Sequence, residues 1–123
     1  MLFRSLSIAI ITDDAERFRG ALVLALAHVA LGEEARLFLQ LDAVRLLAPG
    51  VTAPRDADHV TAGLPALAAL LEEALDGGVG IIACQSGLAM AGHSAWDLDP
   101  RVETGGPISF LQSCDAGDHL LIA

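Results

Sequence analysis

The sequence predicts an α/β fold with a mostly parallel sheet, and two observations lead to this prediction. First, short apolar runs that suit strands alternate along the chain with segments whose apolar residues recur at helical spacing. Second, 54% of the residues are hydrophobic, although the net charge is −9. This composition is expected when helices cover both faces of a sheet and part of the surface is buried between subunits. A length of 123 residues corresponds to one domain, residues 1–123.

The chain opens with a strand followed by a long helix. The strand is expected at residues 7–12, an apolar run that ends in polar residues. Asp13 or Asp14 can cap the helix, because a carboxylate accepts hydrogen bonds from the free amides of a first helical turn. The helix is expected at residues 15–31, where apolar side chains recur every three or four positions, and Gly32 ends it.

The middle of the chain contains a second strand, a long loop and a second helix. An apolar run at residues 35–41 predicts the strand. Residues 49–63 are rich in proline, glycine and aspartate, which predicts a loop that is longer than a simple connection. Pro65 suits the first position of the next helix, whose leucines face inward and whose acidic residues face outward until Gly77 and Gly78 end it.

The last third of the chain continues the alternation of strand and helix. The expected elements are a strand at 79–83 that leads into Cys84, a short helix after it up to about residue 91, a brief strand at 101–103, a helix at 108–114 and a strand at 119–122. The sequence therefore predicts about five strands.

Charge and hydropathy exclude several classes of protein. All seven basic residues are arginines, and a net charge of −9 argues against nucleic acid as a partner, because phosphate binding needs a basic surface. The charge-free run from Gly20 to Gly32 is shorter than the roughly 20 residues that span a membrane. Residues 6–11 are too few for a signal peptide. We therefore expect a cytoplasmic protein with reduced cysteines and no membrane contact.

Cys84 is the residue most indicative of chemistry. It stands where the apolar run at residues 78–83 meets a segment compatible with a helix. In an open α/β sheet such a junction lies at the carboxyl end of a strand, where these folds bind their ligands. The amide end of the following helix favours the thiolate form of a cysteine. A buried cysteine can equally be a small hydrophobic core residue, so the position alone leaves both interpretations open.

The spacing around Cys84 excludes other uses of the thiol. A redox Cys-x-x-Cys motif needs a second cysteine where Gly87 stands, and a Cys-x5-Arg phosphatase loop needs an arginine where Met90 stands. His93 would lie roughly 10 Å along the helix axis, away from the thiol. Cys114 has no spacing relation to Cys84 and is expected to be a packing residue. Two cysteines and four scattered histidines form no zinc pattern, so neither a metal nor another cofactor is predicted.

Segments spread over nearly the whole chain share their order and spacing with a known family. They are Ile10-Ile11-Thr12 and the alanine/leucine helix, Ala35-Arg36-Leu37-Phe38-Leu39 with Asp42-Ala43-Val44, Leu70-Leu71-Glu72-Glu73-Ala74-Leu75, Gly78-Val79-Gly80-Ile81-Ile82-Ala83-Cys84, and Arg101-Val102-Glu103 through Phe110-Leu111 to the last strand. In this order the chain resembles the DsrE/DsrF-like (DsrEFH-like) family of small sulfur-relay proteins, as a single DsrE-like domain.

The resemblance implies a three-layer α/β/α fold and a homo-oligomer, such as a trimer or a hexamer. It also implies an activity, because the cysteine at this strand end carries a persulfide in the sulfur-transferring members. Cys84 would then accept sulfane sulfur from a donor protein and pass it to an acceptor protein, as a sulfurtransferase or sulfur carrier does.

The residues around this cysteine are expected to bind the substrate. Backbone amides that follow it would stabilise a charged sulfur, as helix N-termini do for anions. Acidic and aromatic residues after the other strands would line the same crevice. The expected substrate-binding residues are Gln85, Ser86, Gly87, Asp13 and Asp42, with Trp96 near the same crevice.

Two other functions stay open at this point. In the first, the protein is a binding module whose crevice holds a small ligand or a partner protein, and Cys84 forms only part of the wall. In the second, the protein is a thiol-based redox sensor.

Overall fold

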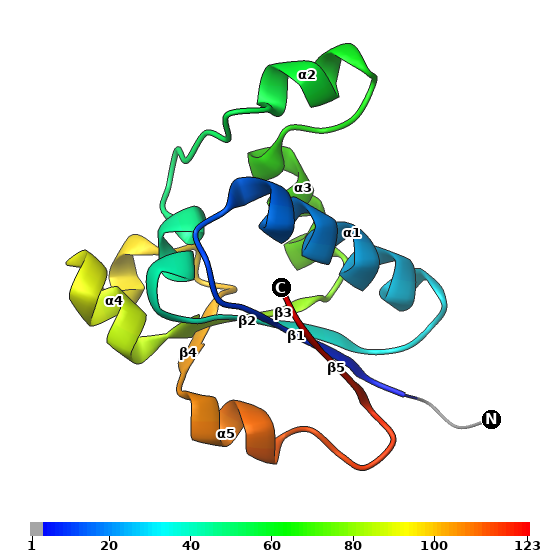
Figure 1. The fold of residues 1–123 in the computed structure, drawn as a ribbon, viewed down its shortest axis with the longest axis vertical. Helices are drawn as coiled ribbons and strands as arrows, with labels where there is room; N and C mark the ends of the chain where they lie inside the picture. Colours follow the sequence, from blue (N-terminus) through cyan, green and yellow to red (C-terminus); the bar gives the residue numbers. More distant parts are fainter. Residues whose placement is uncertain (1–3) are drawn as a thin grey trace.

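Five strands form one parallel sheet at the centre of the protein (Figure 1). The computed structural model describes residues 4–123. The strands are β1 (Leu6–Ile10), β2 (Ala35–Leu39), β3 (Gly80–Cys84), β4 (Glu103–Gly105) and β5 (His119–Ile122). They lie in the order β4-β3-β2-β1-β5, and every neighbouring pair is parallel. The predicted α/β class and sheet are therefore confirmed.

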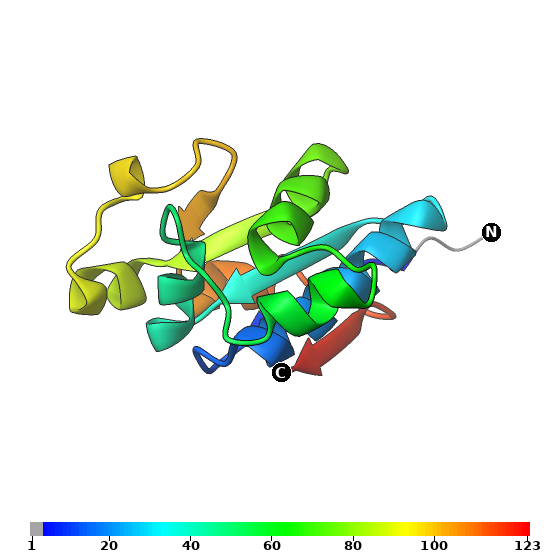
Figure 2. The same ribbon diagram turned by 90° about the horizontal axis from the view of Figure 1, so that it is seen from above.

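Helices lie on both sides of the sheet, which gives the three layers expected of an α/β/α fold (Figure 1); Figure 2 looks onto these layers from above. The helices are α1 (Ala15–Ala30), α2 (Asp56–Thr61), α3 (Leu67–Asp76), α4 (Gln85–Ala91) and α5 (Pro107–Gln112), with 3-10 helices η1 (Leu41–Leu47) and η2 (Ala95–Asp97). Helices α1 and α3 pack against each other on one side, whereas α5 lies on the opposite side (Figure 1). Helix α4 continues directly from β3 at the edge where the strands end.

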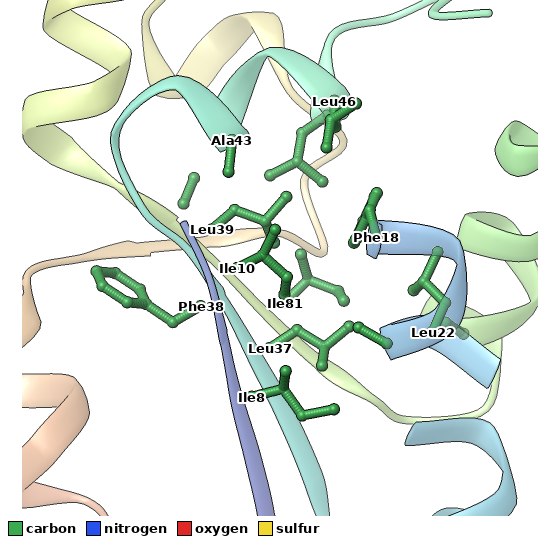
Figure 3. Close-up of a cluster of buried hydrophobic side chains, with 14 of the residues drawn as sticks. Ile8, Ile10, Phe18, Leu22, Leu37, Phe38, Leu39, Ala43, Leu46 and Ile81 are labelled. Carbon is green, nitrogen blue, oxygen red and sulfur yellow. The ribbon is translucent and has the colours of Figure 1, made fainter. Parts of the chain in front are cut away.

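The face of the sheet toward α1 and α3, called here the α1 face, is a continuous aliphatic surface. Successive strand residues point to opposite faces, so every second residue of β1, β2 and β3 belongs to it. Figure 3 shows these side chains packed against Phe18 and Leu22 of α1. The buried residues on this face are Leu6, Ile8, Ile10, Ala35, Leu37, Leu39, Ile81 and Ala83.

The opposite face, called here the α5 face, is mixed in character. Phe38 points to this side (Figure 3). Its ring stacks on that of Phe110 of α5, with ring centroids 4.9 Å apart. The other strand residues here include a hydroxyl, a guanidinium and a thiol. They are Ser7, Ala9, Arg36, Ile82 and Cys84.

Asp14 fixes the start of α1, as the sequence predicts. Its Oδ1 accepts hydrogen bonds from the backbone amides of Glu16 and Arg17, at 2.8 and 3.2 Å. Gly32 follows the end of the helix with a φ of +86°, a conformation that favours glycine. The capping role of the aspartate pair is therefore confirmed for Asp14.

The prediction of a loop throughout residues 49–63 is wrong, because α2 lies within it. This helix buries none of its residues, so it has no apolar periodicity by which the sequence could reveal it. Tertiary contacts of Asp56 hold it instead. The carboxylate accepts hydrogen bonds from the amides of Ala53 (3.1 Å) and Leu67 (2.8 Å) and from the guanidinium of Arg19 (2.7 Å).

Several element boundaries differ from those predicted. The strand expected at 35–41 ends at Leu39, because η1 begins at Leu41, and two further elements start later than expected. Helix α3 begins at Leu67 rather than Pro65, and the Pro65 carbonyl accepts a hydrogen bond from Arg19 instead of starting the helix. Strand β4 begins at Glu103 rather than at residue 101, because Arg101 is held in a turn by Asp99. The contact between Arg19 and Pro65 spans 46 positions and is not visible in the local sequence, whereas the turn made by Asp99 and Arg101 is local.

Candidate functional site

The thiol of Cys84 lies at the junction of β3 and α4, where the sequence placed it. Cys84 is the last residue of β3 and also the N-cap residue of α4, so strand and helix join without a loop. It pairs in register with Gly105 of β4. The residue is only 2% exposed and belongs to the hydrophobic core. The structure therefore presents a covered thiol at the carboxyl edge of the sheet.

The first turn of α4 is close to this thiol but does not hold it. Cys84 makes no side-chain hydrogen bond to the amides of the turn. Gln85 and Ser86 are exposed, whereas Gly87 is buried. The amides expected to stabilise a charged sulfur therefore follow the cysteine directly in the chain, and in this arrangement the sulfur is not bonded to them.

Gly87 allows an unusually close approach between two backbone segments. A methyl group added to Gly87 would overlap the carbonyl oxygen of Leu41 and would lie 2.9 Å from the Leu41 carbonyl carbon and Cα. Leu41 itself has a φ of +50°, which costs energy in a residue other than glycine. The close approach expected at Gly87 is thus made by η1 of the same chain.

Asp42 and Asp13 lie at the same edge of the sheet as Cys84, after β2 and β1. Asp42 is in the first turn of η1, exposed, with Oδ1 3.7 Å from Nε of Arg45. Asp13 is exposed and lines a hollow of about 310 Å³ together with Arg55. Strand β2 separates β1 from β3, which puts Asp13 roughly 10 Å from the line of Cys84. The aspartates therefore share an edge with the thiol, and their role in binding stays a prediction.

Trp96 lies in η2, and its side chain is outside the part of the chain that the structure describes. Its expected place beside the crevice stays a prediction.

The other expected chemical groups are engaged in local contacts. The Cys114 thiol is half-buried and 3.5 Å from the carbonyl oxygen of Phe110, as a packing residue would be. His93 Nδ1 is 3.8 Å from Oδ2 of Asp97. Within residues 4–123, no imidazole is hydrogen-bonded to the Cys84 thiol, and no three metal-ligating side chains are grouped so that they could hold an ion.

A largely apolar hollow lies near this edge of the sheet. It has a volume of about 360 Å³ and is enclosed by residues 47–51, α3 and the segment that contains Leu98. Glu72 and Asp99 stand on its wall, and both pair with Arg101, at 2.6 and 2.9 Å. The Arg101 guanidinium lowers the pKa of Asp99 to about 2. Cys84 does not line this hollow.

Comparison with known proteins places the chain in a family. A profile of the DsrE/DsrF-like family matches residues 7–122. The chain belongs to the DsrE/DsrF-like family. A comparison with curated protein sequences finds no significant match.

Two solved structures have the same fold as this family member. The ychN protein from E. coli superposes with a TM-score of 0.73 at 21% sequence identity, over 99% of this chain and 100% of that chain. MTH1491 from Methanobacterium thermoautotrophicum, a protein of unknown function, superposes with a TM-score of 0.67 at 18% identity, over 98% of this chain and 99% of that chain. Both similarities establish the three-layer fold.

The helices of residues 4–123 fall short of the length and hydropathy needed to cross a membrane.

Proposed function

We propose that the protein is a sulfur-relay protein that accepts and transfers sulfane sulfur as a persulfide on Cys84. The observation that carries this proposal is the place of the thiol. It ends a central strand of a parallel sheet, where such folds bind ligands, in a chain of the DsrE/DsrF-like family. As part of this proposal, residues 1–123 form a single DsrE-like domain.

The transfer needs no oxidant, reductant or metal. The Cys84 thiolate attacks the outer sulfur of a donor persulfide, R–S–SH. The donor S–S bond breaks, a new S–S bond forms on Cys84, and R–S⁻ leaves with the electron pair. An acceptor thiolate then attacks the outer sulfur of the Cys84 persulfide in the same way, so the number of S–S bonds is conserved at each step.

In this proposal, the burial of Cys84 protects the persulfide. A covered persulfide is shielded from water and from reductants in solution, which prevents loss of the sulfur between donor and acceptor. Transfer then requires the segments that pack near the thiol to move. The contact of Leu41 with Gly87 suits such a movement, because the strained backbone of Leu41 stores energy that opening would release.

The proposed substrate-binding groups act once the site opens. The amides of Gln85, Ser86 and Gly87 then stabilise the charged sulfur, as the first turn of a helix does for anions. Asp13 and Asp42, on the same edge, contact the segment of the donor or acceptor protein that approaches it.

We also propose that the protein works in the cytoplasm as a homo-oligomer, a trimer or a hexamer. Exposed aliphatic side chains support an interface. On the edge strand β5, Leu120, Leu121 and Ile122 are 45%, 42% and 64% exposed. An exposed apolar edge strand offers unpaired backbone groups and apolar side chains with which another chain can pair. Sedimentation equilibrium at micromolar concentration checks this, and a monomer would contradict it.

Sulfur loading tests the proposed function directly. After incubation with a small-molecule persulfide, intact-mass spectrometry should show an addition of about 32 Da, the mass of one sulfur atom, on the wild type. Cys84→Ser should lose the addition. Cys114→Ser is the matched control and should keep it, because the Cys114 thiol donates a local hydrogen bond to the Phe110 carbonyl oxygen, which a serine hydroxyl can also make.

Two results would contradict the proposal. One is a wild type that stays unmodified while a known sulfur carrier is loaded in the same tube. The other is a loss of loading in folded Cys114→Ser, which would make the relay depend on two thiols.

The hollow of about 360 Å³ supports a second candidate, a binding module for a small ligand. Its walls are largely apolar with a few charged groups, as ligand sites usually are. Under this hypothesis Cys84→Ser changes nothing measurable, whereas filling the hollow by Ala68→Phe abolishes binding. A thermal-shift screen of both variants against a metabolite library separates the two functions.

A further inference from the structure

The hollow of about 360 Å³ beside α3, called here the α3 hollow, combines an aliphatic lining with acidic groups on its wall. Three segments that are far apart in the sequence enclose it, namely residues 47–51, helix α3 and residues 97–99. All three contribute leucine side chains, which are Leu47, Leu71, Leu75 and Leu98. Sequence reasoning missed this hollow, because no local pattern shows that the three segments meet.

The α3 hollow has the size of a small organic molecule. Ligand pockets in proteins usually measure about 300–1,000 Å³, so this volume lies at the lower end of their range. At about 30 Å³ for each non-hydrogen atom, the share of one water molecule in the liquid, it corresponds to about twelve atoms. Water in such a space contacts mostly hydrocarbon, and its release by an apolar molecule is favourable. The lining therefore suits a ligand with an apolar body of this size.

Each charged side chain that the structure places on the wall of the α3 hollow is acidic. These side chains are Glu72, Asp97 and Asp99. The guanidinium of Arg101 offsets part of their charge, because it lies 2.6 Å from Glu72 and 2.9 Å from Asp99. The same guanidinium also pairs with Asp76, at 3.1 Å. One positive charge thus serves three carboxylates, and Asp97 adds a further negative charge, so the hollow keeps an excess of negative charge.

Two of these carboxylates retain an oxygen for a ligand. Glu72 uses Oε2 for Arg101, and Asp97 uses Oδ2 for the backbone amide of Ser94, at 2.9 Å. The other oxygen of each accepts no hydrogen bond from the groups that the structure describes. Asp99, in contrast, uses both oxygens to hold Arg101. Carboxylates of α3 and η2 therefore have acceptors available at one apolar hollow.

We propose that the α3 hollow binds a small organic amine, whose ammonium group pairs with Glu72 and Asp97 and whose apolar body packs against the leucines. The inference rests on the second candidate function given above and names its ligand class. It does not depend on sulfur transfer, because Cys84 does not line this hollow. The net charge of −9 acts in the same direction, since it attracts cations and repels anions of similar size.

Three indole compounds of similar size test whether the hollow selects a positive charge. Tryptamine is a cation at neutral pH, tryptophol is the corresponding neutral alcohol, and indole-3-acetate is an anion. Each is titrated into the 15N-labelled wild type, and the amide signals are followed by NMR. We expect tryptamine to shift the signals of Ala68, Glu72 and Leu98, which line the hollow.

Tryptamine should bind about fivefold more tightly than tryptophol, and indole-3-acetate should bind most weakly. The expected factor is moderate, because the side chains of Glu72 and Asp97 are 59% and 51% exposed and water screens the ion pair. Equal affinities for the three compounds, or shifts confined to residues outside the hollow, would overturn the proposal.

Substitutions then locate the ammonium group. Glu72→Gln should lower the affinity for tryptamine about fivefold and leave that for tryptophol unchanged. Glu73→Gln is the matched control, because it removes the same charge from the next residue of α3, which is exposed and does not line the hollow. An equal loss in Glu73→Gln would show that only the overall charge attracts the amine. The comparison of tryptamine with tryptophol uses the wild type, so it remains decisive even where Glu72→Gln is unstable.

The outcomes also separate this inference from the two functions proposed above. If tryptophol binds in the hollow as tightly as tryptamine, the selection of an amine is wrong and the binding module stands. Ala68→Phe should abolish the binding of tryptamine, and selective binding that survives this change would place the amine elsewhere and overturn the site. Sulfur loading of Cys84 is measured on the wild type without any amine, so a failure of the relay leaves this result unaffected.

Discussion

The two faces of the sheet are built from the same strands but differ in the residues that they present and in the role that we assign to them. On the α1 face, aliphatic residues of β1, β2 and β3 are buried under α1 and α3 (Figure 3). On the α5 face, the same strands present Ser7, Arg36 and Cys84, and helix α5, of six residues, provides the cover. The proposed chemistry of this protein lies on the second face.

This difference teaches how a small domain can combine stability with a reactive site. Burial of aliphatic side chains is the main favourable term in folding, and the α1 face supplies it. The α5 face can then carry a thiol and the guanidinium of Arg36, whose Nε is buried without a hydrogen-bond partner within residues 4–123, although neither adds much to stability. Three predictions test this division of roles, from the largest expected effect to the smallest.

Removal of side-chain volume should cost far more on the α1 face than on the α5 face. Leu37, on β2, is fully buried, whereas Ile82, on β3, is only half-buried. We expect Leu37→Ala to lower the free energy of unfolding by about 3 kcal/mol and Ile82→Ala by about 1 kcal/mol. Urea denaturation of both variants measures the difference. Equal losses would contradict the division between the faces.

Gly87 lies where α4 contacts η1, and this position should not tolerate a side chain. Gly87→Ala places a methyl group against the Leu41 backbone, and overpacking of this kind costs about 2 kcal/mol. Gly20→Ala is the matched control, because Gly20 lies in helix α1 with no atom near its added methyl. That change should stabilise the protein by about 0.5–1 kcal/mol, since alanine favours a helix. A tolerated Gly87→Ala would show that η1 and α4 move apart readily.

The pairing of Asp99 with Arg101 should appear in the acid stability of the protein. Because the folded pKa of Asp99 is about 2, below its ordinary value of 3.8, the pair stabilises the fold above pH 4. This contribution is lost as the pH falls from about 4 to about 2.

The melting temperatures of the wild type, Asp99→Asn and Arg101→Gln are measured between pH 5 and pH 2. The melting temperature of Asp99→Asn should fall less than that of the wild type over this interval, because asparagine has no carboxylate to protonate. Arg101→Gln should flatten the curve similarly, because it removes the guanidinium that lowers the pKa of Asp99. Identical slopes in all three proteins would show that the pair contributes nothing to stability.

The local sequence was sufficient for the elements whose signals are short-range. Apolar runs located the strands at residues 7–12 and 79–83 closely, because a central parallel strand must be apolar on both faces. The Asp14 cap and the end of α1 at Gly32 were predictable for a similar reason, since the bonds concerned span only a few residues. The position of Cys84 at a strand end was also predictable, because it follows from where the apolar run stops.

Elements held by distant contacts could not be predicted. Helix α2 depends on Arg19, which lies 37 positions before Asp56 in the chain. Helix η1 begins at Leu41, whose positive φ accompanies its contact with Gly87, a residue far away in sequence. In both cases the deciding interaction is between segments that only the folded chain brings together.

The sequence by itself determined the α/β class, the parallel sheet, the family and the place of Cys84 at a strand end, since all of these follow from the order and spacing of residues along the chain. Only the tertiary structure decided that the thiol is buried, that η1 packs on Gly87, and that the Nε of Arg36 is buried without a hydrogen-bond partner within residues 4–123. The physical reason is that burial and hydrogen-bond satisfaction depend on which distant segments pack together, and local residue patterns carry no record of that packing.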